Sequence, residues 1–533
     1  MYGGILMLLD IKPFRNGILN CTEDSIATIL RWLGYDHELL YSKAWWFEYR
    51  RDMQSNGNIG KRIFPTRSNN LVSILKEYYY IEIATVQATD KANFISEVKE
   101  QLFLRKPVLI TLDMYWAPWD KCYKINHSEH SLIISGYNEV SEQFHCIDAF
   151  IMQEGLLLPA DCLEQGCLWY SVMSIKEHNR LHICYEDVIK NVVSEVQCES
   201  IFNSIRDFAD DVEKHLDIES EIYGYDQIWQ VPLVYNLESV DFGRRKFAML
   251  LKYFAENQNN DSLLTLSDKF DLAGSKWGAF RRMLLKYSVA RENTGIRNTV
   301  ADKIRKIADY EESLASELYN ICSRRESVCN NPYHSSMVNL NRKNKSSIKT
   351  FLVDLTEHFN NNAFGSILSK ECTADLSGLG AYFLSKGLPE GDIWNIENMK
   401  FKFPTLEDGK NDNVSCCGQN ISFTGGYFSS IALIACCDVG CFSDTLTINY
   451  DDGQTEEIIV KLTDISASNP VYGETVACEV DCVERDNNGE VNISIRGRIL
   501  AKEYCIQGKG MITGITLPHC PGIHIFAISL NQF

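Results

Sequence analysis

The chain is short of basic residues for its length. Its 52 lysines and arginines stand against 71 aspartates and glutamates, which gives a net charge of −19. This deficit excludes a general nucleic-acid binder, because such proteins need a basic surface that releases counterions. It also argues against docking on anionic membranes. We therefore expect neither nucleic acid nor a membrane among the partners.

Long apolar runs and an export signal are also lacking. No apolar run reaches the roughly 18 residues needed to cross a bilayer. The opening MYGGILMLLDIKPF has no basic n-region and is interrupted by Asp10 and Lys12. The 19 cysteines are an odd number, and neighbours such as Cys416 and Cys417 do not easily bridge each other. We therefore expect reduced cysteines, mostly small core residues, in a cytoplasmic protein.

Three compositional regions follow one another. Residues 1–180 mix helix and strand signals, and residues 181–335 have helical 3.6-residue spacing with few prolines. A polar stretch over 330–349 is typical of a linker. The last region, residues 345–533, is predicted to start with a short helical piece from about residue 350, and strand signals separated by turns dominate from about 400 to the end. The sandwich proper is expected from about residue 371. The fold class predicted is α+β: a mixed domain, a helical domain and an all-β sandwich.

Cys21 precedes a predicted helix over residues 24–33, in the segment Gly-Ile-Leu-Asn-Cys-Thr-Glu-Asp-Ser. A thiol attacks as the thiolate, and a helix N-terminus lowers the thiol pKa through its dipole and its free N–H groups. The backbone N–H of Cys21 would then help to form an oxyanion hole. The alternative is that Cys21 is a packing residue, as most free cysteines are.

A base and its partner follow on a predicted hairpin. His130 opens a strand that runs to Ser135, a turn is predicted at Gly136–Asn138, and a second strand ends at Asp148. In such a hairpin Asp148 lies near His130 and can accept the second imidazole N–H, which fixes the tautomer. The order of cysteine helix, histidine strand and aspartate strand predicts a nucleophile, a base and an orienting group.

These local sequences resemble the papain-like superfamily, and most closely the family of butirosin biosynthesis protein H. The resemblance covers residues 12–180 and is carried by Asn20-Cys21, by the run from Arg105 to Tyr115, by His127-Ser-Glu-His130 up to Gly136-Tyr137, and by Ile147-Asp148. A weaker likeness continues in Trp277-Gly-Ala-Phe280-Arg281.

The resemblance implies a papain-like fold and an acyltransferase of natural-product or antibiotic biosynthesis. Such an enzyme takes an acyl group from the phosphopantetheine thioester of an acyl or peptidyl carrier protein, and it needs no cofactor of its own. Cys21 would form the acyl-enzyme, His130 would deprotonate a small-molecule amine or hydroxyl acceptor that could contain a sugar, and Asp148 would hold His130. The sequence departs from papain in lacking an upstream glutamine, for which Asn16 or Asn20 could substitute in the oxyanion hole.

Further candidates lie near the expected strands. Asp113 and Tyr115 either line the acyl or acceptor pocket or belong to a solvated loop. His127 and His130 form H-x-x-H, but no third ligand follows at a suitable spacing, so we expect no metal and regard His127 as a pocket-wall residue. The aromatic cluster over residues 45–49 is either core or the wall of a substrate channel.

A basic stretch interrupts the acidic chain between residues 281 and 310. Arg281, Arg282 and Lys286 could dock an acidic carrier protein, or they could belong to a solvated helix face.

The last region, from about residue 371, resembles the jelly-roll, galactose-binding-like β-sandwich modules appended to glycosidases. Phrases such as Asn449-Tyr-Asp-Asp-Gly453 and Ile515-Thr-Leu-Pro518 carry this likeness, which implies fold more safely than function. Three functions therefore stay open: the acyltransferase, a cysteine peptidase or amidase with water as acceptor, and a non-catalytic glycan-binding protein.

Overall fold

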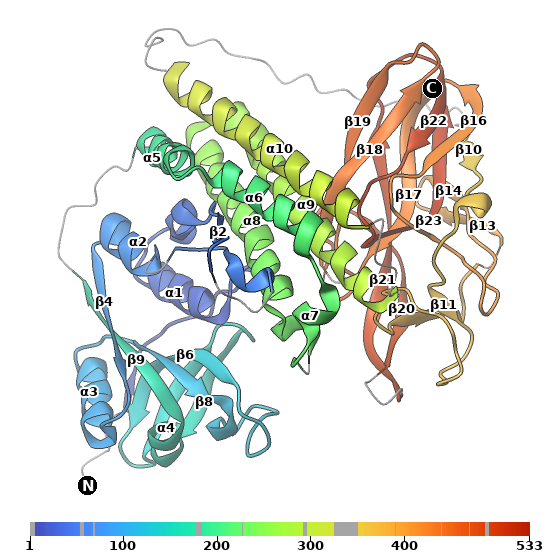
Figure 1. Cartoon of the computed structure of the whole chain (residues 1–533). Helices are drawn as coiled ribbons and strands as arrows, with labels where there is room; N and C mark the ends of the chain where they lie inside the picture. The colour runs from blue at the N-terminus through green and yellow to red at the C-terminus, as the bar shows by residue number, and fades with distance from the viewer. Residues whose placement is uncertain are drawn as a thin grey trace.

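The computed structural model describes residues 6–53, 58–67, 70–175, 184–225, 227–290, 296–324, 350–389, 391–438, 440–467, 469–485 and 490–532. It is a mixed α and β structure with a β-rich C-terminal region (Figure 1). The linker predicted over 330–349 lies outside the described residues. In the part of the chain that is described, no helix combines the length and the apolarity needed to cross a membrane.

A seven-stranded antiparallel sheet organises the first third. Its strands run in the order β4-β9-β5-β6-β7-β8, and β1 pairs with β6. Their bounds are β1 Leu6–Leu8, β4 Ile81–Gln87, β5 Val108–Asp113, β6 Glu129–Asn138, β7 Gln143–Asp148, β8 Gln153–Pro159 and β9 Cys167–Ile175. The helices here are α1 Cys21–Trp32, α2 Asn70–Tyr79, α3 Lys91–Phe103 and α4 Ala160–Gly166, and a small separate sheet joins β2 Glu48–Tyr49 to β3 Ile63–Phe64.

The two faces of this sheet have separate cores because successive side chains of a strand point to opposite faces. Ile133 of β6 packs in one cluster with the apolar face of α1, whereas Leu132 and Ile134 pack in another with α3 and α4. The sheet is therefore covered by helices on both faces, and α1 is held against the strands that carry His130 and Asp148.

The turn predicted at Gly136–Asn138 is wrong. These residues continue β6, and the turn falls at residues 139–142. The strand continues because Tyr137 is buried on the ring of Phe144 and because β6 pairs with β1 on one side and β7 on the other. Asp148 is still the last residue of β7, as predicted. Cys146, two residues before it, pairs with Ile134 of β6.

Helices make up the middle of the chain: α5 Tyr185–Cys198, α6 Ile201–His215, α7 Ile218–Ile222, α8 Pro232–Gln258, α9 Asp261–Ala290 and α10 Ile296–Arg324. The long helices α8 and α9 form a hairpin, and Asn259 makes its turn in the left-handed conformation with φ 49°. Pro232 begins α8 at a position where its missing N–H leaves no helical bond unmade.

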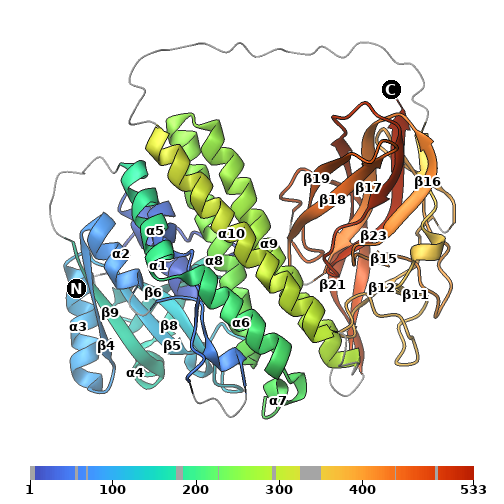
Figure 2. The ribbon, with the colours of Figure 1, turned by 45° about the horizontal axis from the view of Figure 1, so that its top comes forward.

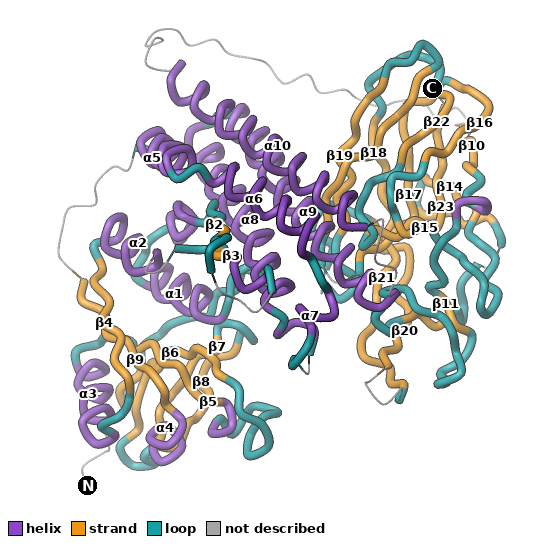
Figure 3. Tube along the Cα trace, viewed as in Figure 1, coloured by secondary structure: helices purple, strands orange, loops and turns teal. Residues whose placement is uncertain are grey.

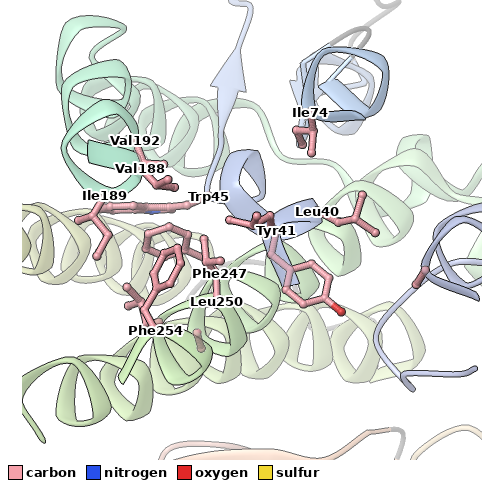
Figure 4. Packing of buried hydrophobic residues seen from close by; sticks show 14 of the residues in the cluster. Leu40, Tyr41, Trp45, Ile74, Val188, Ile189, Val192, Phe247, Leu250 and Phe254 are labelled. Atoms are coloured by element: carbon pink, nitrogen blue, oxygen red, sulfur yellow. The ribbon is translucent and has the colours of Figure 1, made fainter. Parts of the chain in front are cut away.

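One core cluster joins the first third to the helices. Figure 4 shows Trp45 packed among α5 and α8 side chains that include Val188, Phe247 and Phe254, while Tyr41 of the same cluster lies to one side. The interpretation of residues 45–49 as core is correct, and the channel-wall alternative is wrong, because Trp45, Trp46, Phe47 and Tyr49 are all buried. The shared core therefore crosses residue 180.

The C-terminal strands form two sheets with a common core, a sandwich-like arrangement. One sheet contains β10 Thr350–Val353, β11 Phe364–Gly365, β12 Tyr382–Leu384, β15 Val414–Ser415, β17 Phe428–Cys437, β20 Thr475–Arg485, β21 Val491–Cys505 and β23 Ile523–Gln532. The other contains β16 Asn420–Gly426, β18 Phe442–Tyr450, β19 Thr455–Leu462 and β22 Ile512–Thr516, and a separate hairpin joins β13 Ile393–Ile396 to β14 Met399–Lys402. The sheets lie against α9 and α10, on the side away from the first sheet (Figures 2 and 3).

Candidate active site

Cys21 is the first residue of α1, and the start of that helix is tightly capped. The Asn20 side chain accepts a hydrogen bond from the Glu23 N–H at 2.9 Å, and the Glu23 carboxylate accepts from the Asn20 N–H at 3.0 Å. This reciprocal capping box satisfies two N–H groups that a helix start leaves without partners. The helix therefore begins three residues earlier than predicted, and its dipole and first-turn N–H groups act directly on the Cys21 thiol.

His130 and Asp148 meet where β6 begins and β7 ends. His130 Nε2 lies 3.0 Å from both carboxylate oxygens of Asp148. An ionised carboxylate can only accept, so Nε2 carries the proton and Nδ1 is left as the basic nitrogen. Asp148 is 2% exposed and also accepts from the Phe150 N–H at 3.0 Å and the Ile151 N–H at 3.3 Å. These bonds fix the carboxylate, and through it the imidazole tautomer.

The Cys21 thiol lies beside the His130 imidazole, and each group shifts the pKa of the other. Burial alone would raise the pKa of the Cys21 thiol, but the bonds from His130 and from the Ser131 backbone outweigh it and lower this pKa to about 7. Burial would lower the pKa of His130, yet Asp148 and Cys21 raise it to about 9. Between about pH 7 and 9 the pair is therefore a thiolate facing an imidazolium.

Among the described cysteines with a shifted pKa, Cys21 stands apart because its pKa falls. Burial raises the pKa of the others, as it does for Cys146, Cys167 and Cys482. A thiolate that forms near neutral pH marks a reactive cysteine, whereas an apolar site marks an inert one. Cys21, which the sequence order selects, therefore remains the candidate nucleophile.

Two neighbouring hydroxyls were missed by the sequence reasoning. Thr22 Oγ1 and Ser131 Oγ lie 2.6 Å apart and join the second residue of α1 to the third residue of β6. Each is the next residue after a catalytic candidate, so their adjacency in the sequence was a usable signal. The bond holds the Cys21 helix in register with the His130 strand.

The side chains proposed for the oxyanion hole have other partners. Asn16 donates its amide N–H to Tyr41 Oη at 3.3 Å, and the Asn20 side-chain oxygen is used by the cap. Asn16 is thus engaged elsewhere, whereas the cap uses only the oxygen of Asn20, so a role for the Asn20 amide N–H in the oxyanion hole stays a prediction. The backbone N–H groups of the first turn of α1 remain as donors for a developing oxyanion.

Asp113, Tyr115 and His127 form a separate cluster beside His130. His127 Nδ1 lies 2.6 Å from Asp113 Oδ2, and the His127 ring stacks on Tyr115 with centroids 4.5 Å apart. Burial would raise the pKa of Asp113, but His127 and backbone N–H groups lower it overall. Because Asp113 pairs with Glu129 across the β5–β6 ladder, the cluster lies one residue from His130. His127 is 73% exposed, so it belongs to the rim of the site rather than to a pocket wall.

No set of three or more His, Cys, Asp or Glu side chains suitable for a metal gathers within the residues that the structure describes. His127 is engaged with Asp113, and His130 with Asp148 and Cys21.

The docking role expected for Arg281 and Arg282 is wrong. Arg281 is 7% exposed and pairs with Glu238, while Arg282 is 1% exposed and donates to Asp438 and to the Ser377 carbonyl. Both are buried because α9 packs between α8 and the C-terminal sheets. Lys286 lies within α9, and its side chain is outside the described residues.

A cavity of about 490 Å³ lies at the opposite end of α1. Gly34, Tyr35 and Asp36 line it together with residues of α2, α5 and α8. The 12 residues of α1 separate this cavity from Cys21 by about 18 Å. It is therefore not part of the thiol site.

No family model matches the chain, and no curated protein sequence does. Among solved structures, a family GH115 4-O-methyl-alpha-glucuronidase with specificity for decorated arabinogalactans matches at 12% identity with a TM-score of 0.14. The match covers 66% of this chain and 42% of that one, so the chain spans less than half of that enzyme's length. At such a TM-score the likeness carries no argument about fold or activity.

Proposed function

We propose that the chain is a papain-like thiol acyltransferase that moves an acyl group from a carrier-bound thioester to an amine or hydroxyl acceptor. The observation that carries the proposal is the Cys21 thiol at the start of α1 beside His130, which lowers the thiol pKa and whose Nε2 lies 3.0 Å from both carboxylate oxygens of the buried Asp148. A helix start, an imidazolium and a fixed tautomer are what a thiolate nucleophile needs.

The reaction follows from these groups. The Cys21 thiolate attacks the thioester carbonyl, and the first-turn N–H groups of α1 stabilise the oxyanion of the tetrahedral intermediate. The carrier thiol then leaves and takes a proton from the His130 imidazolium. In the second half, His130 accepts a proton from the attacking amine or hydroxyl, and the acyl–Cys21 bond breaks to regenerate the thiolate. Asp148 stabilises the imidazolium throughout.

The finer fold assignments belong to the same proposal. We assign residues 1–180 to a papain-like domain, 181–335 to a helical domain and 345–533 to a jelly-roll, galactose-binding-like sandwich. The helix start set against an antiparallel sheet supports the first assignment, and the two sheets with one core support the last. We also propose a cytoplasmic location, because a free thiol nucleophile must stay reduced.

Transfer rather than hydrolysis is favoured by the local sequence resemblance to the butirosin biosynthesis protein H family. The partners proposed are an acyl or peptidyl carrier protein, which presents phosphopantetheine, and a small amine or hydroxyl acceptor. The carrier surface is not the one formed by Arg281 and Arg282, since both are buried in pairs with other residues.

Intact-mass spectrometry of the full chain mixed with acyl-loaded carrier proteins tests the proposal, with a small acyl thioester as a second donor. We expect an acyl adduct that peptide mapping places on Cys21, that Cys21→Ala abolishes and that Cys184→Ala, a change of an exposed cysteine, leaves intact. Added amines should then collect the acyl group. Release to water alone, or cleavage of peptides, would identify a hydrolase, and no adduct with any thioester would refute an acyl-enzyme.

A further inference from the structure

Three consecutive basic residues of α8, Arg244, Arg245 and Lys246, each bind a different part of the molecule. Arg244 is fully buried and pairs with Glu311 of α10 at 2.9 Å. Arg245 pairs with Asp241 and donates to the Cys441 carbonyl beside the C-terminal sheets at 2.9 Å. Helix α8 is thus fixed to its neighbours on two sides by the residues that precede Lys246.

Lys246 reaches the start of α1. Its ammonium lies 2.7 Å and 2.6 Å from the two carboxylate oxygens of Glu23. The side chains are 14% and 26% exposed, so the pair is largely shielded from water. Glu23 is the residue that closes the capping box on Asn20, directly before Cys21. One carboxylate therefore serves both the cap of the nucleophile helix and a cation from α8.

We propose that Lys246 is a positioning residue for the Cys21 nucleophile, acting through Glu23. This inference rests on the proposed role of Cys21. Lys246 orients the Glu23 carboxylate so that it bonds the Asn20 N–H, which sets the backbone at Cys21. It also neutralises a negative charge in the same first helical turn as the thiolate.

The charge effect has a definite sign. A carboxylate without its cation disfavours a second negative charge nearby, so loss of Lys246 should make the thiolate harder to form. Asp24 of the same helical turn interacts with Glu23, Lys246 and Arg15. His130 faces the thiol from β6. None of these groups replaces the contact of Lys246 with Glu23.

Alkylation of the purified full chain by iodoacetamide, followed residue by residue with mass spectrometry, measures the pH midpoint of Cys21 reactivity. Lys246→Met should raise this midpoint by about 0.5–1 pH unit, and Lys246→Arg should restore it. Glu23→Gln combined with Lys246→Met should also return it to within about 0.3 unit, because glutamine still closes a capping box without a charge.

Lys252→Met is the matched control, since Lys252 lies on the same helix, is 59% exposed and lies 4.0 Å from Glu256. Its midpoint should equal that of the unaltered chain. A folded Lys246→Met variant with an unshifted midpoint, or a double variant that stays shifted, would overturn the proposal. Alkylation needs no acyl donor, so this result stands apart from that of the acyl-transfer experiment.

Discussion

Replacing Asp148 by asparagine should favour a neutral thiol and a neutral imidazole over the thiolate–imidazolium pair, while keeping the shape of the site. Asparagine retains an oxygen for the Nε2–H of His130 and for the Phe150 N–H, but it has no charge. Burial lowers the pKa of His130, and Asp148 contributes most to raising it from 6.5 to about 9, ahead of Cys21. Loss of the charge should therefore lower the pKa of His130 by about 1–2 units. Since the imidazolium stabilises the thiolate, the pKa of Cys21 should rise from about 7 toward about 8.

The midpoint of Cys21 alkylation against pH is the appropriate readout, because a thiolate of higher pKa is also a better nucleophile and a single rate would mix the two effects. We expect the midpoint to rise by about 1 unit in Asp148→Asn and further in His130→Ala. Asp113→Asn is the control, because Asp113 pairs with His127 rather than with His130. If the alkylation midpoint of Asp148→Asn lies within about 0.3 unit of the midpoint of the unaltered chain, the assigned electrostatics are refuted.

Other predictions concern buried charges. Arg282→Met should lower the free energy of unfolding by about 3–5 kcal/mol, because it removes the guanidinium that pairs with the buried Asp438 carboxylate. A denaturant titration that shows a loss under about 1 kcal/mol would contradict this. Glu311→Gln should cost about 3 kcal/mol by the same measurement, because the carboxylate pairs with Arg244 and accepts from two tryptophans. Burial raises the pKa of Asp24 from 3.8 to about 6. The carboxyl therefore ionises more readily in the unfolded chain, so the free energy of unfolding falls as pH rises from about 4 to 6 and stays lower above pH 6. Asp24→Asn should therefore stabilise the chain by about 1–2 kcal/mol at pH 8 but not at pH 4, and equal effects at both pH values would refute the assignment.

The start of α1 shows how far local sequence reasoning reaches. The apolar spacing located the helix, but the prediction began it at Asp24, whereas Asn20 and Glu23 make the cap that starts it at Cys21. That signature was present in the sequence, since an asparagine followed three residues later by glutamate marks a helix start. The hairpin order likewise placed His130 and Asp148 together, although the turn was predicted at residues 136–138 and lies at residues 139–142.

The ion-pair partners of Arg282 and Lys246 depend on packing between residues that lie far apart in the sequence. Arg282 was interpreted from a run of charges, yet its partner Asp438 lies 156 positions away and could not be inferred from spacing. Lys246 and Glu23 are separated by 223 positions and carry no local sign of their pairing. A charge count along the chain cannot distinguish a solvated helix face from a face that another domain covers.

The core shared by Trp45, Phe247 and Phe254 has a practical consequence for dividing the protein. A fragment ending near residue 180 would retain all three groups of the thiol site but lose the α5 and α8 side chains that cover Trp45 and Tyr41. Its newly exposed aromatic surface would favour aggregation over folding. A minimal catalyst cut from this chain should therefore extend at least to the end of α10, at Arg324.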